Sequence, residues 1–122
     1  MTQALILFAH GSRDPAWREP IEAVAARVRA LAPHTLVACA YLEHTTPDLP
    51  TVATQLIASH ADEIWVRPLF LGVGRHARED LPALMDALRL QHPQVRFHLQ
   101  ASVGEEQQVL DALATVALQG IA

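Results

Sequence analysis

The chain has 122 residues, of which 51% are hydrophobic, and it carries a formal net charge of −4. This length fits one domain with a sizeable core, and the acidic balance argues against nucleic-acid binding through a general basic surface. The apolar runs are too short to span a bilayer and the first residues lack the basic start of a signal peptide, which together predict a cytoplasmic protein.

Strand and helix patterns alternate along the chain without a long linker. An apolar run predicts a strand at 3–8, and apolar residues at helical spacing predict a helix at 15–31, with Asp14 as its N-cap. The patterns that follow predict strands at 35–42, 63–71 and 95–100 and helices at 47–59, 81–91 and 105–118. Strict alternation favours a parallel sheet with right-handed crossovers and with helices on both faces. We therefore predict a single three-layer α/β domain over 1–122, with a four-stranded parallel sheet flanked by helices.

The basic residues are all arginines, nine in number, and lysine is absent. Schiff-base chemistry and the phosphate-binding lysine of P-loops are therefore excluded. An anion site in this chain must use arginine, whose planar guanidinium suits carboxylates. Cys39 is the only cysteine, and its apolar surroundings predict a small core residue rather than a reactive thiol.

The sequence lacks the common phosphate-binding motifs. Neither GxGxxG after the first strand nor GxxxxGK[ST] occurs, so we expect no nucleotide cofactor. The segment 72–74 is only a GxG, which is more economically explained as a flexible turn after the third strand. GxSxG is also absent, which disfavours a hydrolase with Ser12 as nucleophile.

Two histidines follow apolar strands. His10 closes the first strand and precedes a Gly-Ser-Arg-Asp segment, and His76 follows the third strand after the glycine turn. Ligands of open α/β sheets bind beyond the carboxyl ends of the strands, so the two imidazoles are expected to share one crevice. For either histidine alone, a structural role at a strand end would be the simpler interpretation. Their matching contexts favour a functional role.

Glu43 follows the second strand and is expected at the same edge of the sheet. Two imidazoles and one carboxylate would suit a divalent transition metal. The three residues come from three separate loops, so they form a tertiary constellation and not a sequence motif. His44 would either assist Glu43 or be solvated. Structural or surface roles are more common for the remaining histidines, which are His34, His60, His92 and His98.

Arginines accompany both candidate histidines. Arg13 lies in the first loop, and Arg75 and Arg78 flank His76. They would either pair with neighbouring carboxylates or bind a ligand that carries several carboxylates.

Three segments resemble the small sirohydrochlorin chelatases, also called the short cobaltochelatase family, within the class II chelatase superfamily. These segments are Leu7-Phe8-Ala9-His10-Gly11-Ser12-Arg13-Asp14-Pro15, Tyr41-Leu42-Glu43, and Pro68-Leu69-Phe70-Leu71-Gly72-Val73-Gly74-Arg75-His76 followed by Asp80-Leu81-Pro82. His-Gly-Ser-Arg together with Pro-Leu-Phe-Leu-x-x-Gly-x-His is specific, whereas either half alone is not. The similarity covers essentially the whole chain.

The resemblance implies ATP-independent insertion of a divalent metal into the tetrapyrrole sirohydrochlorin, on the route to cobalamin or sirohaem. Co²⁺ is the first expectation, with Fe²⁺ or Ni²⁺ as alternatives. His10 and His76 are implied as metal ligands, and Glu43 as a further ligand or proton acceptor. The residues that would bind the tetrapyrrole carboxylates are Ser12, Arg13, Arg75 and Arg78. A chain of this length resembles half of a two-domain chelatase, which implies a homodimer.

Two other functions remain open. A non-catalytic carrier of metal or tetrapyrrole would use the same histidines and arginines. A phosphohydrolase with His10 as nucleophile is less favoured, because that class needs an arginine immediately before the histidine and Ala9 stands there.

Overall fold

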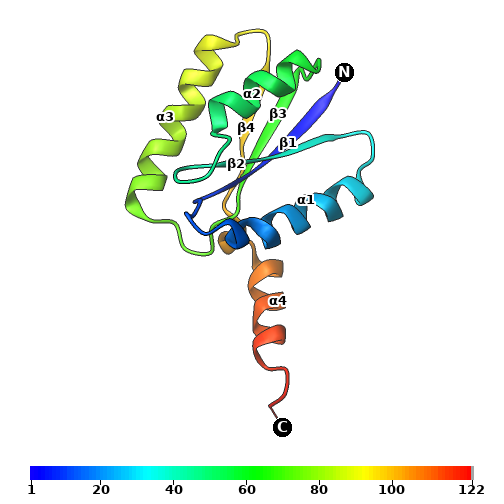
Figure 1. The fold of residues 1–122 in the computed structure, drawn as a ribbon, viewed down its shortest axis with the longest axis vertical. Coiled ribbons are helices and arrows are strands. Elements are labelled where there is room, and N and C mark those ends of the chain that lie inside the picture. The colour runs from blue at the N-terminus through cyan, green and yellow to red at the C-terminus, as the bar shows by residue number, and fades with distance from the viewer. Residues whose placement is uncertain (122) are drawn as a thin grey trace.

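Four parallel strands in the order β2-β1-β3-β4 form the sheet, as Figure 1 shows. The computed structural model describes residues 1–121. The strands are β1 (Gln3–Ala9), β2 (Leu36–Tyr41), β3 (Glu63–Pro68) and β4 (Arg96–Leu99). The predicted α/β architecture with a four-stranded parallel sheet is therefore confirmed. β3 ends at Pro68, before the predicted residue 71.

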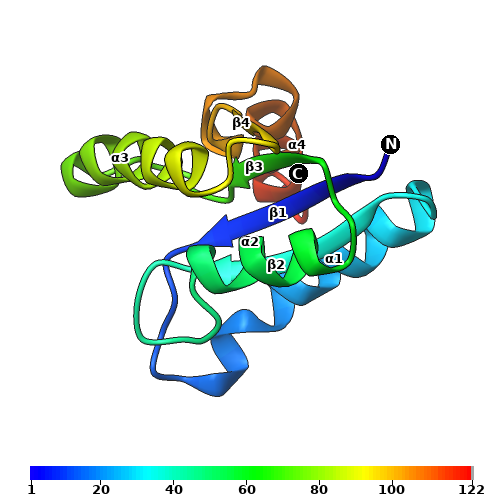
Figure 2. The ribbon, with the colours of Figure 1, turned by 90° about the horizontal axis from the view of Figure 1, so that it is seen from above.

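Helices lie on the two faces of the sheet. α1 (Glu19–Leu31) packs on β2 and β1, whereas α2 (Leu49–Ala58) and α3 (Arg75–Gln91) cover the other face. Figure 2 shows α1 and α3 on opposite sides of β1. Successive strand residues point to opposite faces, so Ile6 and Phe8 enter the buried core under α2 and α3, while Leu5 faces the α1 side.

Cys39, expected in the core, is only partly buried on edge strand β2, and this burial raises the pKa of its thiol.

The predicted helix at 15–31 forms as two pieces. A 3₁₀ turn, η1 (Pro15–Arg18), precedes α1, and the carboxylate of Asp14 accepts a hydrogen bond from the backbone N–H of Ala16 at 3.0 Å, as the predicted N-cap requires. Pro20 lies in the first turn of α1. Proline has no N–H to bond to a preceding turn, so it suits a helix start and separates the two pieces.

α3 begins at Arg75 rather than at 81, which corrects the sequence prediction. Pro82 lies inside the helix, and Gly74 occupies the N-cap position. This shift places His76 and Arg78 in the first helical turn instead of in a loop. α2 likewise begins at Leu49 rather than at 47, with Asp48 as its cap.

The predicted last helix also divides in two, and its second piece stands apart from the sheet. η2 (Val103–Glu105) precedes α4 (Gln107–Ala117), and none of the described residues of α4 is buried. Figure 1 shows α4 projecting away from the other elements. A groove of about 440 Å³ remains open between α1 and β3, lined by Val28 and Trp65 among others. Helices therefore lie on both faces as predicted, but α4 covers neither face within the described residues.

No helix within the described residues is long and apolar enough to cross a membrane.

Asp48 provides a test of the capping interaction in α2. Its carboxylate accepts a hydrogen bond from the backbone N–H of Thr51 at 2.9 Å, and its hydrogen bonds with Thr51 lower the pKa of Asp48. Replacing Asp48 with alanine should reduce the free energy of unfolding by about 1 kcal/mol at neutral pH. A carboxyl group whose pKa is lower in the folded state than in the unfolded state stabilises the fold when it is ionised. Its contribution should be present above the unfolded value of roughly 3.9 and lost as pH falls through the folded value.

Urea unfolding of wild type and Asp48→Ala from neutral to acid pH measures this difference. Asp48→Asn is the matched control, because it keeps an oxygen acceptor at the cap but cannot ionise. A stability difference between wild type and Asp48→Ala that stays constant with pH would contradict the expectation.

Candidate functional site

The carboxyl ends of β1 and β3 lie side by side, and the candidate histidines follow these two strand ends in the chain. β1 pairs with β3, but the helix that follows β1 lies on one face of the sheet and the helix that follows β3 lies on the other. Neighbouring strands whose connections leave toward opposite faces form a crevice, which is the usual ligand position in such sheets. His10 follows β1 and His76 opens α3, so the two histidines come from the two sides of this crevice.

The imidazole of His10 stacks against Phe70. The ring centroids are 4.1 Å apart and the ring planes are inclined by 30°. Phe70 is buried, whereas His10 is exposed. The phenyl ring therefore supports one side of the imidazole while His10 stays accessible to a ligand. The apolar run around Phe70 predicts only a strand residue, so its role beside His10 is visible in the structure alone.

Glu43 is held beside His10 by a close contact between two loops. The backbone N–H of Glu43 donates to the carbonyl oxygen of His10 at 3.0 Å. Gly11 has a φ of 93°, and a Cβ at this position would lie 1.7 Å from the carbonyl oxygen of Glu43. Only glycine allows both this backbone conformation and this approach. The carboxylate of Glu43 is exposed, with Oε1 3.8 Å from Nε2 of His44.

Thr45 joins the same two loops through its hydroxyl group. The hydroxyl accepts a hydrogen bond from the backbone N–H of Ser12 at 2.9 Å and donates to the carbonyl oxygen of Ser12 at 2.8 Å. The hydroxyl of Ser12 in turn accepts from the backbone N–H of Asp14 at 3.1 Å. Sequence analysis marked Ser12 but missed Thr45, whose partner is 33 positions away in the chain. Local patterns do not report such pairs.

The N-terminus of α3 brings positive charge to the crevice. The first N–H groups of a helix have no intrahelical partner and carry a partial positive charge, and Gly74 supplies no side chain to cap them. Arg75 forms an ion pair with Glu79 at 3.2 Å, but its side chain is 81% exposed. Exposed ion pairs of this kind are weak, so the guanidinium of Arg75 remains available to another anion.

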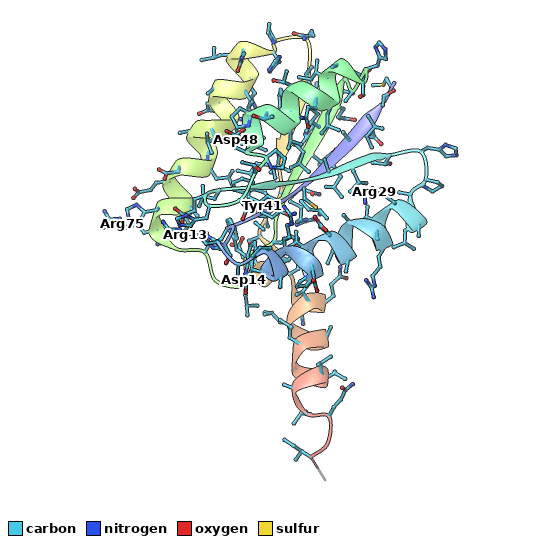
Figure 3. All side chains as sticks on the ribbon, viewed as in Figure 1. Arg13, Asp14, Arg29, Tyr41, Asp48 and Arg75 are labelled. Carbon is cyan, nitrogen blue, oxygen red and sulfur yellow. The ribbon has the colours of Figure 1, made fainter. Side chains whose placement is uncertain are left out.

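The predicted arginines surround the crevice instead of gathering at one point. Arg13 lines a cavity of about 220 Å³ together with Ser12, Arg18 and His44. In Figure 3, Arg13 and Arg75 lie toward the same end of the molecule. Arg78 lines a separate cavity of about 140 Å³. This distribution suits a ligand with several separated carboxylates better than a single small anion.

Ser102 anchors the segment that carries Phe70. Its side chain is buried, its hydroxyl accepts a hydrogen bond from the backbone N–H of Phe70 at 3.1 Å, and it donates to the carbonyl oxygen of the same residue. Gly104 approaches so closely that a Cβ there would lie 1.8 Å from the carbonyl oxygen of Leu71. Glu105 completes a capping box with Ser102. The Ser-x-x-Glu pattern was a signal in the sequence that would have marked this turn.

His10, Glu43 and His76 do not form a closed ligand set within one chain. Among residues 1–121, no three histidine, cysteine, aspartate or glutamate side chains are close enough to hold a metal ion together. His10 and Glu43 belong to contacting loops, whereas His76 belongs to α3. The possible metal donors therefore lie in two separate groups, with His10 and Glu43 in one and His76 in the other.

A second histidine–carboxylate pair lies at the opposite end of the sheet. Glu63 begins β3, and its carboxylate is 2.8 Å from Nε2 of His98, whose ring stacks on Trp65 with centroids 3.9 Å apart. Hydrogen bonds from Gln3 and from His98 lower the pKa of Glu63. These contacts agree with the structural role expected for His98.

Known proteins match this chain over nearly its whole length. The CbiX family model matches residues 4–119. A sirohydrochlorin cobaltochelatase from Methanococcus aeolicus is 31% identical over 83 residues, which cover 68% of this chain and 58% of the relative. The matched segment therefore spans less than two thirds of that relative's length.

Solved structures share the fold. A CbiX protein from Marinobacter aquaeolei VT8 superposes with a TM-score of 0.82 at 32% identity, over 94% of this chain and 93% of that chain. The sirohydrochlorin chelatase SirB from Bacillus subtilis subspecies spizizenii, in complex with cobalt, superposes with a TM-score of 0.81 at 24% identity, over 94% of this chain but 49% of that chain. The second likeness bears on the fold alone. Because the family model spans almost every residue, the chain belongs to the CbiX family.

Proposed function

We propose that the protein is an ATP-independent sirohydrochlorin chelatase that inserts a divalent metal into the tetrapyrrole, in the cytoplasm, for cobalamin or sirohaem synthesis. The observation that carries this proposal is the position of His10 and His76 on the two sides of one crevice, with arginines around it. Family membership and the cobaltochelatase names of relatives support the reaction class. We take residues 1–122 as one chelatase domain.

The metal is a substrate in this proposal, and Co²⁺ is the first candidate, with Fe²⁺ and Ni²⁺ as alternatives. Neutral imidazole binds all three of these metals, so the donor set itself does not select among them. Relatives named cobaltochelatase favour Co²⁺. An open set of donors suits a substrate metal, because the ion must leave the protein for the macrocycle.

Metal insertion requires two proton transfers. The metal brings two positive charges, and two pyrrole N–H groups each release one proton, so the charge of the macrocycle–metal unit balances. In our proposal His10 and His76 hold the metal at the crevice, and Glu43, exposed beside His10, accepts protons and passes them to water. Ser12, Arg13, Arg75 and Arg78 bind the carboxylates on the rim of the tetrapyrrole.

We also propose that the working form is a homodimer. The match covers only 49% of the SirB chain, so this chain has about half the length of that protein. A tetrapyrrole is broad relative to the cavities of one chain, of which those at the crevice measure about 220 and 140 Å³. A second copy would supply the opposite wall.

The histidine assignments are tested by anaerobic absorbance spectroscopy of sirohydrochlorin with Co²⁺, Fe²⁺ or Ni²⁺. His10→Ala and His76→Ala should each slow the initial rate of metal insertion at least about tenfold. Both variants should still bind the tetrapyrrole. His34→Ala is the matched control, because His34 is exposed at the opposite end of the sheet. Unchanged insertion rates in both site variants would refute the assignment, and the absence of any rate acceleration in wild type would favour a carrier.

The arginine assignments predict an effect on substrate affinity. Arg13→Gln and Arg75→Gln should each raise the KM for sirohydrochlorin several-fold at low ionic strength, with kcat nearly unchanged. The increase should shrink as salt is added, because exposed charges are screened. Arg27→Gln, an exposed change on α1, is the control. Equal effects of all three substitutions would indicate general charge attraction and not specific carboxylate binding.

Ser102 is predicted to act as a positioning residue through Phe70. Ser102→Ala leaves a buried N–H and carbonyl of Phe70 without the hydroxyl partner, which should cost about 1–3 kcal/mol of stability. In conditions where the variant stays folded, kcat should fall while the KM for sirohydrochlorin is kept, because the support of His10 is loosened. Ser59→Ala, at the exposed end of α2, should change neither constant. Loss of stability with an unchanged kcat would show a purely structural role.

A further inference from the structure

The C-terminal helix α4 carries an apolar side that nothing covers in the described chain. Leu110, Leu113 and Val116 recur at helical spacing and are 47%, 44% and 59% exposed. Asp111 and Thr115 lie on the other side of the helix. An amphipathic surface helix normally buries its apolar stripe, so α4 is a helix that lacks its packing partner.

The same chain has an apolar groove without an occupant. The groove of about 440 Å³ lies over β1 and β3 next to α1, and its walls include Leu5, Leu7, Val24, Val28, Trp65 and Val103. On this face α1 packs on β2 and β1. A sheet face in a three-layer fold is ordinarily covered by a helix, so the groove has the place and the chemistry of a helix-binding surface.

α4 is directed away from the groove of its own chain. Arg67 borders the groove, and its guanidinium donates to the carbonyl oxygen of Ala101 at 2.7 Å and to the carboxylate of Glu106 at 3.2 Å. Glu106 is the N-cap residue of α4. These contacts hold the base of α4 at the rim of the groove, while Figure 1 shows the helix axis leaving the molecule.

We propose that two copies of this chain exchange their α4 helices, so that the apolar side of each α4 lies in the groove of the other copy. This inference rests on the homodimer proposed above and adds how the copies join. A two-fold axis uses the same helix–groove pair twice and leaves neither surface free, which closes the assembly at two copies. The occupant is a second copy because the helix and the groove that match in character belong to one chain and point apart. The SirB chain is about twice as long as the segment it shares with this chain, which agrees with a working unit twice the size of one copy.

Sedimentation equilibrium of the full chain at micromolar concentration tests the exchange. Wild type should be a dimer. Leu113→Glu puts a charge on the apolar side of α4, and Val24→Glu puts one on the exposed wall of the groove, so each variant should be a monomer. Thr115→Glu adds the same charge to the opposite side of α4 and should remain a dimer. Circular dichroism verifies that each variant is folded, and Val116→Glu replaces Leu113→Glu if the latter is not.

A mixing experiment separates exchange from other modes of association. When the Leu113→Glu and Val24→Glu chains are combined, one intact helix meets one intact groove, so a mixed dimer should form although neither variant dimerises alone. A monomeric wild type, dimeric single variants or a mixture that stays monomeric would each overturn the proposal; the last result would point to α4 folding back onto its own groove.

Mass and insertion rate are measured on the same samples, which keeps the two proposals separate. A dimer that passes the mixing test but shows no metal insertion refutes the chelatase and leaves the exchange standing. An active enzyme whose variants remain dimeric refutes the exchange and leaves the chelatase standing.

Discussion

The parallel pairing of β1 with both of its neighbours is the constraint on which the site depends. After the strands end, the ladder continues: Leu42 N–H donates to the carbonyl oxygen of Ala9 at 2.9 Å, and Leu69 N–H donates to that of Phe8 at 2.7 Å. These bonds align the start of three loops at one edge of the sheet. Parallel strands need long crossovers, so residues that meet at this edge are far apart in sequence. His10, Glu43 and His76 therefore come from three different connections of the same sheet.

Close backbone contact converts this alignment into a defined geometry. Glycine is required at position 11 because the loop that contains Glu43 touches it, and at position 104 because the carbonyl of Leu71 does. Two hydroxyl groups then hold these segments together. The hydroxyl of Thr45 binds the backbone of Ser12, in the loop after β1, and the hydroxyl of Ser102 binds the backbone of Phe70, whose ring contacts His10. The exposed imidazole thus rests on a buried and fully hydrogen-bonded support. Such support is what a metal ligand needs in order to keep its position.

The two faces of the sheet differ in how completely they are covered. On the α2 and α3 side, Phe8, Met85 and Phe70 are buried in one continuous core. On the α1 side, the groove next to Trp65 is open and α4 has no buried residue in the described chain. In the proposed homodimer, a second copy would account for both the open crevice and the open groove. One copy would then hold the metal and part of the tetrapyrrole, and the other would complete both surfaces.

The sequence by itself determined the alternation of elements, the four parallel strands and the placement of His10 and Glu43 just after strands, because apolar periodicity and strand ends are local properties. The roles of those residues stay proposals. Only the tertiary structure decided that α3 begins at Arg75, because the sequence pattern alone predicted a start at residue 81. Only the tertiary structure revealed Thr45 and Ser102, whose partners are 33 and 32 positions away. Apolar spacing likewise predicts α4 without saying what it covers, because burial depends on which surfaces meet in space.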